Sequence, residues 1–237
     1  MNNSCPVCDQ VCESSVLKHE FWGTEILSCN YCSHQFSSDF IDTTDDIFAT
    51  NRIRAEHYTR IIEEIQPTSM IDVGTPSDFL LLKLVNSVLE SCELYALDVY
   101  EKPSPDFIQM LSPENIKPTE ICTALHVLEH VQDPETFVRL LINNSKYWII
   151  EVPNITDINS LRTSSQKPHF HFFNISSFTK LISEASASAE IVVRFGRDMP
   201  KNRSCLIAHN LPKDIDVLHQ RSRLSSLIRR LTSKIDR

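Results

Sequence analysis

Glycine is scarce in this chain: only three of its 237 residues are glycine. Because glycine has no Cβ, it is the usual residue in tight turns and in loops whose backbone approaches a phosphate. A loop built from several closely spaced glycines is therefore excluded. The turns of this protein have to be made largely by Pro, Asn, Asp and Ser.

Long apolar runs and an excess of positive charge are missing too. No apolar run reaches the roughly 18–20 residues of a membrane-spanning helix, and the N-terminal residues lack the basic and apolar regions of a signal peptide, so we expect a cytoplasmic protein. The chain has 23 Lys and Arg against 31 Asp and Glu, a formal net charge of −8, which argues against bulk binding to nucleic acid. Its 41% hydrophobic content is enough for one α/β domain with a small appendage.

Cysteine, in contrast, is concentrated near the N-terminus, where five of the eight cysteines lie within the first 32 residues. Four of them form two Cys-x-x-Cys pairs separated by 20 residues: Cys5 with Cys8, and Cys29 with Cys32. Each pair directs two thiolates toward one point, and two such turns facing each other make a tetrahedral sulfur site suited to Zn²⁺. Cys12 and His34 are expected to lie beside this site without binding the metal.

These cysteine pairs predict a zinc ribbon over residues 1–38. Residues 16–22 and 24–28 are typical of short strands around a turn at Gly23. A segment of about 35 residues buries too little apolar surface to fold alone, and metal binding supplies on the order of 10 kcal/mol. Four thiolates leave no open coordination position, so we expect a structural metal. Residues 39–50 are acidic and polar, as expected of a linker.

The chain from residue 51 to 212 alternates between helix and strand patterns. Apolar residues at helical spacing predict helices at 51–65, 79–89, 134–143 and 178–185. Short apolar runs predict strands at 70–73, 93–99, 120–125, 147–152, 190–195 and 204–209. This alternation indicates a mostly parallel sheet that is covered on both faces and binds ligands at the carboxyl ends of its strands. Residues 103–118 and 154–167 are expected to be loops.

Polar side chains follow three of these strands. Asp72 and Gly74 follow the first strand, and Asp98 ends the second, 26 residues after Asp72. The third strand leads into residues 126–130, a segment with two histidines and a glutamate. A carboxylate at the end of the second strand can accept hydrogen bonds from both hydroxyl groups of a ribose. The sequence therefore predicts a nucleoside site at this edge of the sheet.

Three segments carry a resemblance to a known family: MIDVG (70–74), ALDVY (96–100) and LHVLEHVQDP (125–134). They resemble the motifs of class I S-adenosylmethionine (SAM)-dependent methyltransferases. The resemblance extends from about residue 51 to residue 209 and implies a Rossmann-like, doubly wound, mostly parallel sheet of seven strands. The zinc ribbon, IIEVPN (149–154) and KPHFHFFNISSF (167–178) narrow it to a zinc-ribbon-bearing branch that includes the C-methyltransferases of deoxysugar biosynthesis.

The resemblance implies a cofactor, an acceptor and the residues that bind the cofactor. These residues would be Asp72, Gly74, Asp98, Val99, Leu125 and His126. Asp98 would bind the ribose of SAM, and Leu125 and His126 would lie beside its adenine and methionine parts. The acceptor would be a small molecule, namely a sugar or a nucleotide-linked sugar. Whether the methyl group goes to carbon, oxygen or nitrogen stays open.

A proton acceptor is implied as well. In the deoxysugar methyltransferases a histidine near an HFFN-like stretch and an acidic neighbour serve proton transfer at the sugar. The matching residue here is His169, with His130 as the second candidate and His171 as the third. This sequence departs from the pattern, because Pro168 stands where the acidic neighbour would be.

The loop after the first strand also departs from the family pattern, which has three alternating glycines. It keeps Gly74 but has Pro76 and Asp78 at the next two places. Pro76 lacks an N–H donor, and the carboxylate of Asp78 near that of methionine would cost roughly 1–4 kcal/mol unless Ser77 or Asp78 caps the following helix. Two hypotheses stay open: a working methyltransferase, and a methyltransferase-like protein whose degenerate cofactor loop leaves it a binding or scaffolding partner.

Residues 213–237 predict a basic amphipathic helix. Its apolar residues fall on one side and are Leu224, Leu227, Ile228, Leu231 and Ile235. Three roles fit this pattern. The helix docks on the domain, it self-associates through a seam of near-heptad spacing, or it attaches to an anionic membrane surface.

Overall fold

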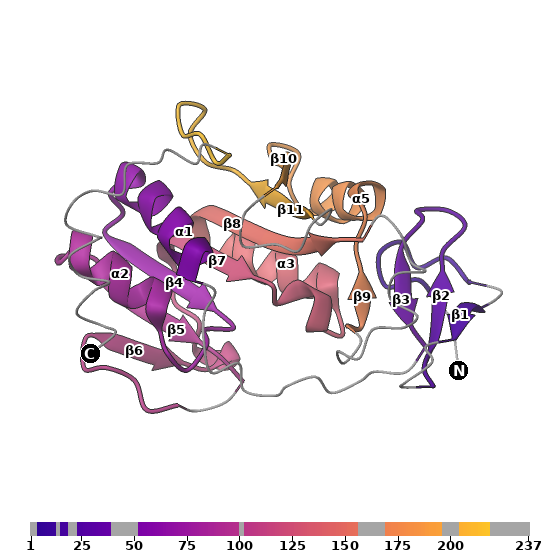
Figure 1. Cartoon of the computed structure of the whole chain (residues 1–237), viewed down its shortest axis with the longest axis horizontal. Helices are drawn as coiled ribbons and strands as arrows, with labels where there is room; N and C mark the ends of the chain where they lie inside the picture. Colours follow the sequence, from indigo (N-terminus) through magenta and orange to yellow (C-terminus); the bar gives the residue numbers. More distant parts are fainter. Residues whose placement is uncertain are drawn as a thin grey trace. The chain divides into compact units, whose positions relative to one another are not determined.

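A computed structural model describes residues 4–12, 15–18, 23–38, 52–99, 102–155, 169–195 and 204–218 (Figure 1). The chain divides into two compact units. The first contains residues 1–45, 124–143 and 148–210, and the second contains residues 46–123, 144–147 and 211–237. The predicted linker at 39–50 and residues 219–237 of the predicted C-terminal helix lie outside the described residues. Among the described helices, none is long and apolar enough to cross a membrane.

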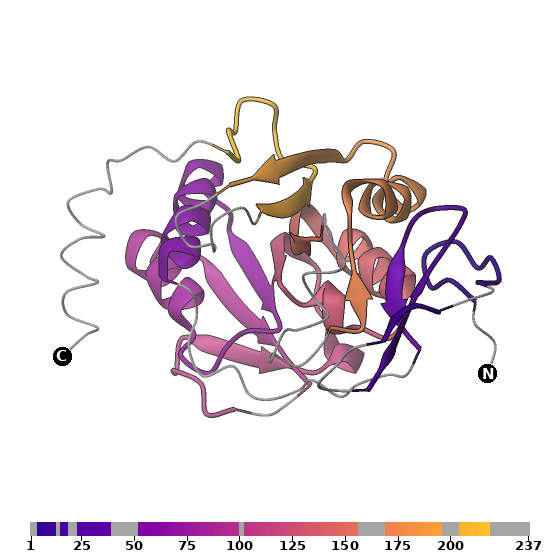
Figure 2. The same cartoon turned by 45° about the vertical axis from the view of Figure 1, so that its right-hand side comes forward.

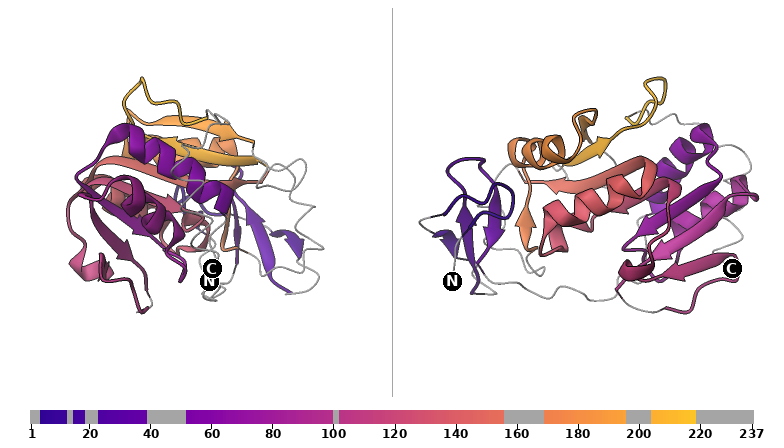
Figure 3. Two further views of the ribbon diagram at one scale, coloured as in Figure 1. Left: turned by 60° about the vertical axis from the view of Figure 1, so that its left-hand side comes forward. Right: turned by 180° about the vertical axis from the view of Figure 1, so that it is seen from behind.

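The second unit is built from alternating helices and strands. In chain order they are α1 (Arg52–Ile65), β4 (Ser69–Val73), α2 (Leu80–Val88), β5 (Glu93–Leu97), β6 (Ile108–Leu111) and the 3-10 turn η1 (Pro113–Asn115). Helix α1 buries Ala55, Tyr58 and Ile62, which share one helical face, and it packs against α2 (Figure 3). Strands β4, β5 and β6 pair in parallel. Met70 and Ile71 of β4 are both buried, as expected of a strand that is covered on both faces.

Strand β6 corrects one prediction, because it lies within residues 103–118, which the sequence predicts as a loop. Ile108 and Leu111 at its ends are buried, whereas the two residues between them are not. Four residues with this pattern do not stand out from a loop by their periodicity. Strand β6 is nevertheless the strand that brings the six predicted strands to seven.

The first unit joins the N-terminal ribbon to later segments of the chain. The ribbon strands β1 (Ser15–Lys18), β2 (Glu25–Ser28) and β3 (Gln35–Ser37) form a four-stranded sheet with β9 (His171–Phe172), in the order β1-β2-β3-β9 (Figure 2). The two predicted ribbon strands are present where they are described. The sequence predicts neither β3 nor β9, which are only three and two residues long.

The remaining elements of the first unit are η2 (Leu128–His130), α3 (Pro134–Asn143), most of β8 (Ser145–Asn154), α5 (Ile175–Ala185), β10 (Glu190–Arg194) and β11 (Ser204–His209). Helix α5 begins at Ile175 and not at 178 because Asn174 caps it. Asn174 Oδ1 accepts from Ser177 N at 3.0 Å, and Asn174 N donates to Ser177 Oγ at 3.2 Å. Helix α5 buries Phe178 and packs against α3.

Seven strands form one sheet in the order β10-β11-β8-β7-β4-β5-β6, in which β7 is Thr119–Leu125. Strands β4, β5 and β6 run parallel, whereas β11 is antiparallel to both β8 and β10. The predicted α/β class and the seven-stranded, mostly parallel sheet are thereby confirmed.

Candidate functional site

Asp72 lies beneath the loop that follows β4. Its side chain is buried, and its carboxylate oxygens accept hydrogen bonds from the hydroxyl groups of Thr75 at 3.0 Å and Thr123 at 2.6 Å. Burial raises the pKa of Asp72 to about 6, although the two hydroxyl groups act in the opposite direction. Asp72 therefore ties the loop to the strands below it.

The loop after β4 uses several of its own hydrogen-bond donors. Gly74 N donates to the carbonyl of β5 residue Leu97 at 2.7 Å, and Phe79 N donates to Pro76 O at 2.9 Å. Pro76 itself has no N–H to offer. The carboxylate of Asp78 faces its own helix, since the amide of the first helical residue donates to Asp78 Oδ1 at 3.2 Å. The N-cap position, however, is Phe79, which makes no capping bond with its side chain.

Two residues other than glycine, in or after predicted cofactor-binding segments, have a left-handed backbone conformation that only glycine adopts without strain. Gly74 has a φ of 69°, which glycine adopts without strain. Phe79 has a φ of 51° and His126, at the end of β7, a φ of 60°. Left-handed conformations of residues other than glycine cost of order 1–3 kcal/mol, and they gather at functional sites. Phe79 follows the predicted cofactor loop that begins at Gly74, and His126 is itself a predicted cofactor-binding residue. Both strained positions are therefore candidates for a functional role.

Asp98, the predicted ribose ligand, follows β5 and is held by Lys102. Lys102 Nζ lies 3.0 Å from Asp98 Oδ2 and donates to Thr75 O at 2.7 Å. The side chains of Lys102 and Asp98 are only 8% and 11% exposed, so solvent screens this ion pair little. Lys102 thus connects the predicted ribose carboxylate to the loop after β4. Val99, predicted to lie beside the cofactor, is 70% exposed.

At the end of β7, His126 stands between two buried carboxylates. Its Nδ1 lies 3.2 Å from Glu129 Oε1, and its Nε2 lies 3.1 Å from Glu151 Oε1. Burial disfavours the protonated imidazole, but the contacts with Cys205, Glu129 and Glu151 outweigh burial and raise the pKa of His126 well above its ordinary value. These contacts therefore favour the protonated form of His126. Leu125, which precedes it, is half-buried.

Arg194 of β10 extends this arrangement to four charges. Its Nε donates to Glu151 Oε2 at 2.9 Å and its Nη2 donates to Glu151 Oε1 at 3.2 Å, and both side chains are almost fully buried. Negative and positive groups alternate from Glu129 through His126 and Glu151 to Arg194. Each buried charge has an oppositely charged neighbour, which is the condition under which burial of charges is tolerated.

The two predicted proton acceptors, His130 and His169, come together although they are 39 positions apart in the sequence. Their ring centroids are 4.7 Å apart, and the rings are nearly perpendicular. One carboxylate oxygen of Glu129 lies within 4.8 Å of a ring nitrogen of each histidine. Glu129, from a different part of the chain, thus places an acidic side chain beside His169, whose neighbour in the sequence is Pro168.

The charges in this cluster favour proton transfer. Burial lowers the pKa of His130, so its ring is neutral at pH 7. Burial alone would raise the pKa of Glu129, but His126, His169 and His130 outweigh it and lower this pKa to about 2. A neutral imidazole beside an ionised carboxylate is the arrangement that a general base requires.

His171, the third candidate, is engaged elsewhere. Its Nε2 lies 2.7 Å from the carbonyl oxygen of Val131, and its Nδ1 lies 2.9 Å from His34 Nε2. Burial lowers the pKa of His171 to about 4. Because both ring nitrogens are hydrogen-bonded within a buried cluster, we assign this histidine a structural role.

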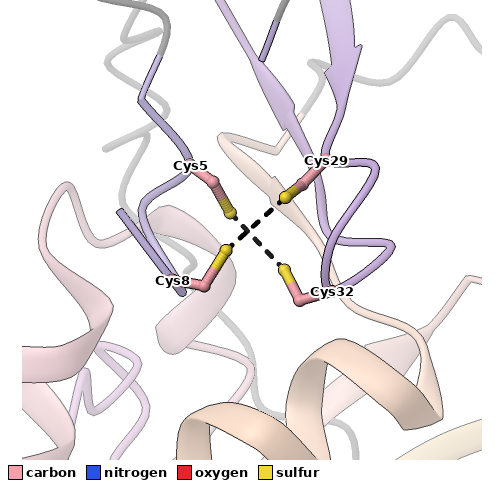
Figure 4. Close-up of side chains that lie close together, drawn as sticks. All are labelled: Cys5, Cys8, Cys29 and Cys32. Carbon is pink, nitrogen blue, oxygen red and sulfur yellow. Dashed lines mark hydrogen bonds between the residues drawn. The ribbon is translucent and has the colours of Figure 1, made fainter. Parts of the chain in front are cut away.

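The four predicted metal ligands converge on one point (Figure 4). The Sγ atoms of Cys5 and Cys32 are 3.6 Å apart, those of Cys8 and Cys29 are 3.5 Å apart, and all four lie within 4.8 Å of one another. With a Zn–S distance of about 2.3 Å, the sulfur atoms of a tetrahedral site lie about 3.8 Å apart. The cluster therefore fits a zinc ion. None of the eight cysteines, all of which lie in the described part of the chain, forms a disulfide bond.

The two cysteine pairs lie in turns of the same kind. In the first turn Asp9 N donates to Cys5 O at 2.8 Å, and in the second Ser33 N donates to Cys29 O at 2.9 Å. Asp9 and Ser33 have φ values of 56° and 59°, the left-handed region that glycine usually occupies. The prediction that Asp and Ser replace glycine in the turns is confirmed at these two positions.

Sequence reasoning missed three residues of these sites: Lys102, Glu151 and Arg194. Glu151 and Arg194 lie inside the apolar strand runs IIEV and EIVVR, and a charge in such a run signals a paired buried charge. Lys102 follows Asp98 by four residues in a segment without helical periodicity, so the sequence offers no comparable signal for it.

Comparison with known proteins identifies the fold. No protein-family profile and no curated sequence matches the chain. Its structure resembles that of a protein assigned as an O-methyltransferase from Nostoc punctiforme PCC 73102, with a TM-score of 0.52 and 13% identity over 67% of this chain and 56% of that one. The fold is that of a SAM-dependent methyltransferase.

Two further structures agree with this methyltransferase fold. Both are of the plantazolicin methyltransferase BpumL with S-adenosylhomocysteine (SAH). The complex with a monoazolic desmethylPZN analog has a TM-score of 0.52 and 13% identity over 71% of this chain and 86% of that one. The complex with a triazolic analog has a TM-score of 0.51 and 14% identity over 67% and 84%. This chain therefore spans 56% of the Nostoc protein but most of BpumL.

We expect Asp72 to make stability depend on pH. Since the folded state raises its pKa from 3.8 to about 6, folding favours the protonated acid, and the free energy of unfolding falls as pH rises from about 4 to about 6. The loss is about 3 kcal/mol at most. Urea titrations of the wild type and Asp72→Asn at several pH values measure it as the difference between the two. Asp106→Asn, at an exposed position of the same unit, should parallel the wild type, and identical pH profiles for all three proteins would contradict the assignment.

The alternating charges predict a large cost for removing Arg194. Arg194→Met leaves Glu151 buried without its guanidinium partner, so we expect the free energy of unfolding to fall by roughly 3–5 kcal/mol. Lys180→Met is the matched control, because Lys180 pairs with Glu184 at an exposed position and its loss should cost less than about 1 kcal/mol. Equal effects of the two substitutions in urea denaturation would show that the buried pair is not stabilising.

Proposed function

We propose that this protein transfers a methyl group from SAM to a small-molecule acceptor, namely a sugar or a nucleotide-linked sugar. One observation carries the proposal: Asp98 follows the carboxyl end of β5, next to the Gly74 loop at the carboxyl end of the parallel strand β4. Open α/β sheets bind their ligands outside these strand ends. The methyltransferase fold and the SAH in the BpumL complexes support SAM as the ligand.

The residues at this edge fit the ribose of SAM. A carboxylate has about four lone-pair positions, so Asp98 can accept hydrogen bonds from ribose hydroxyl groups while Lys102 stays bound to Oδ2. The carboxylate of Asp78 faces the amide of Leu80, which reduces its repulsion of the methionine carboxylate. Asp72 contributes from below by holding Thr75 of the loop in place.

Bound SAM would supply an electrophilic methyl group. Methyl transfer is an in-line displacement, so the main contribution of the protein is to hold the acceptor close and aligned. We assign to His169, with His130 beside it, the removal of the acceptor's proton onto a ring nitrogen. The ionised carboxylate of Glu129 then stabilises the imidazolium that results.

We further propose that the cysteine cluster holds a structural zinc ion. Its four thiolates fill all positions of a tetrahedral site, so no ligand position is left for a substrate. Zinc would instead supply folding free energy to a ribbon that is too small to fold on its own apolar surface.

The zinc proposal predicts one zinc ion per chain. Elemental analysis of the purified protein by mass spectrometry should find this ratio, and Cys8→Ser or Cys29→Ser should lower it well below one, because each removes a ligand. Cys92→Ser is the matched control, since Cys92 is a buried cysteine of the second unit, and it should keep the full ratio. A wild type that binds no zinc with its thiols reduced would refute the assignment.

The methyltransferase proposal predicts that the protein binds SAH and that Asp98 contributes to the affinity. Calorimetry should detect binding, and Asp98→Ala should weaken it about 10- to 100-fold, because hydrogen bonds to a charged group contribute about 1.5–3 kcal/mol. Asp106→Ala serves as the control from an exposed position of the same unit, and its affinity should equal that of the wild type. Equal weakening by both substitutions would place the ligand away from Asp98.

A second function, a binding or scaffolding protein with a degenerate cofactor loop, is favoured by one group of contacts. Lys102 joins Asp98 to Thr75, Pro76 removes a donor, and the amide of Phe79 is used within the loop. In this case neither SAM nor SAH gives detectable heat at millimolar concentration. The variant Lys102→Met, in which Asp98 loses its ion pair with Lys102, should then also show no heat of binding. If the protein is a methyltransferase, the same variant should still bind SAH detectably.

A further inference from the structure

The four metal-binding cysteines and the segment that carries His169 and His171 belong to the same unit. His34 connects them. The carbonyl oxygen of His34 accepts from Cys29 N at 2.8 Å and so closes the second cysteine turn. The ring of the same residue reaches His171, because His34 Nε2 lies 2.9 Å from His171 Nδ1. One residue therefore contacts both a metal-binding turn and β9, which follows His169 in the chain.

The direction of this histidine pair is fixed by its surroundings. The Val131 carbonyl can only accept, so His171 Nε2, at 2.7 Å, carries the proton and donates. His171 Nδ1 is then the acceptor, and His34 Nε2 is the donor. Both rings are almost fully buried, with exposures of 0% for His34 and 1% for His171. The hydrogen bond thus has one polarity and little access to water.

The main chain makes a second connection between the ribbon and His169. Strand β3 pairs with β9, with Phe36 opposite His171, and Ser37 N donates to Phe170 O at 2.9 Å. The Ser37 hydroxyl donates to the carbonyl of His169 itself at 3.1 Å. On the other side, Phe170 N donates to Glu129 O at 3.0 Å. His169 is therefore fastened on one side to the ribbon and on the other to η2, which carries Glu129 and His130.

Aromatic packing follows the same path. The ring of His34 stacks on Phe36 with centroids 5.9 Å apart, and it lies 4.9 Å from the ring of Phe173. Phe173 in turn contacts Phe178 of α5 at 5.8 Å. The ribbon is thereby packed against the start of the helix that follows β9.

We propose that the metal-bound ribbon is the positioning element for the segment that carries His169. Strand β9 has two residues, too few to hold a conformation without a partner strand. The four cysteines fix the turn that leads into β3, β3 holds β9, and His34, Ser37 and His171 fix the segment from 169 to 171 against Glu129. The inference rests on the zinc part of the proposed function and is independent of methyl transfer.

Hydrogen exchange measured by mass spectrometry tests this coupling without cofactor or acceptor. We compare the zinc-loaded protein with protein from which the metal has been removed by a thiol-reactive mercurial and a chelator. Amides of residues 169–174 should exchange at least about 10-fold faster without metal. Amides of β11, in the same unit but not paired with the ribbon, are the internal control and should be unchanged.

Variants that keep all four cysteines separate positioning from folding. His34→Phe retains an aromatic ring but loses the donor to His171, and Ser37→Ala loses the hydroxyl that holds His169. Both should keep one zinc ion per chain and still accelerate exchange at 169–174. His34→Gln, whose amide restores a donor, should recover most of the protection that His34→Phe loses. Ser183→Ala removes an exposed serine hydroxyl bond within α5 and should have no effect at 169–174.

The outcomes are distinct. Unchanged exchange at 169–174 both after metal removal and in His34→Phe overturns the proposal. If metal removal also accelerates exchange in β11, the unit has lost its fold, and the zinc-loaded variants decide the question. A failure to bind SAH affects none of these measurements, and a failure to bind zinc is seen directly in the metal content.

Discussion

The buried carboxylate of Glu129 is the constraint on which the first unit depends. An ionised carboxylate with 1% exposure costs several kcal/mol in lost hydration unless positive or polar groups surround it. Here His126 forms an ion pair with it, and His130 and His169 stand beside it. These histidines come from three places in the chain, so satisfying one charge requires β7, η2 and the segment before β9 to assemble together.

The second unit has a different constraint, which is the backbone conformation of the loop after β4. This loop turns sharply but contains only one glycine. The strain is carried by Phe79, whose buried ring keeps its unfavourable backbone in place. Asp72, held by two threonine hydroxyl groups, and Lys102, which bridges to the loop carbonyl of Thr75, stiffen the turn. The shape of this loop is thus held by side-chain contacts and not by a run of glycines.

Local patterns in the sequence predicted the features that depend on local physics. The Cys-x-x-Cys spacing led directly to the sulfur cluster. The six strands predicted from apolar runs between residues 70 and 209 all formed, and strands buried on both faces, such as β4 and β11, leave a clear signature in the sequence. Strands β3, β6 and β9 were not predicted, because a strand of two to four residues is too short to show a periodic pattern of apolar residues. The bond between His34 and His171 spans 137 residues, and no pattern within a short window reveals a contact of that range.

In the candidate site, too, local patterns revealed some residues, whereas their partners depend on tertiary packing. Asp98, His130 and His169 were predicted because they stand at strand ends or in a family motif. The family pattern has an acid where this chain has Pro168, and the acid that lies near His169 is Glu129. The partner of Asp98 is Lys102. Which acid meets which base is decided by how η2 and β9 pack, and this is a property of the folded unit.

The pairing of β3 with β9 also has a consequence for the order in which the molecule is made. The ribbon emerges from the ribosome more than a hundred residues before the strand that completes its sheet. In a ribbon that has already bound its metal, the edge of β3 would stay unpaired until β9 is synthesised, and β9 would then pair with this preformed edge. Because each doubling of a flexible loop adds only about 0.6 kcal/mol to the cost of closing it, the length of the intervening chain is a small obstacle to this late pairing.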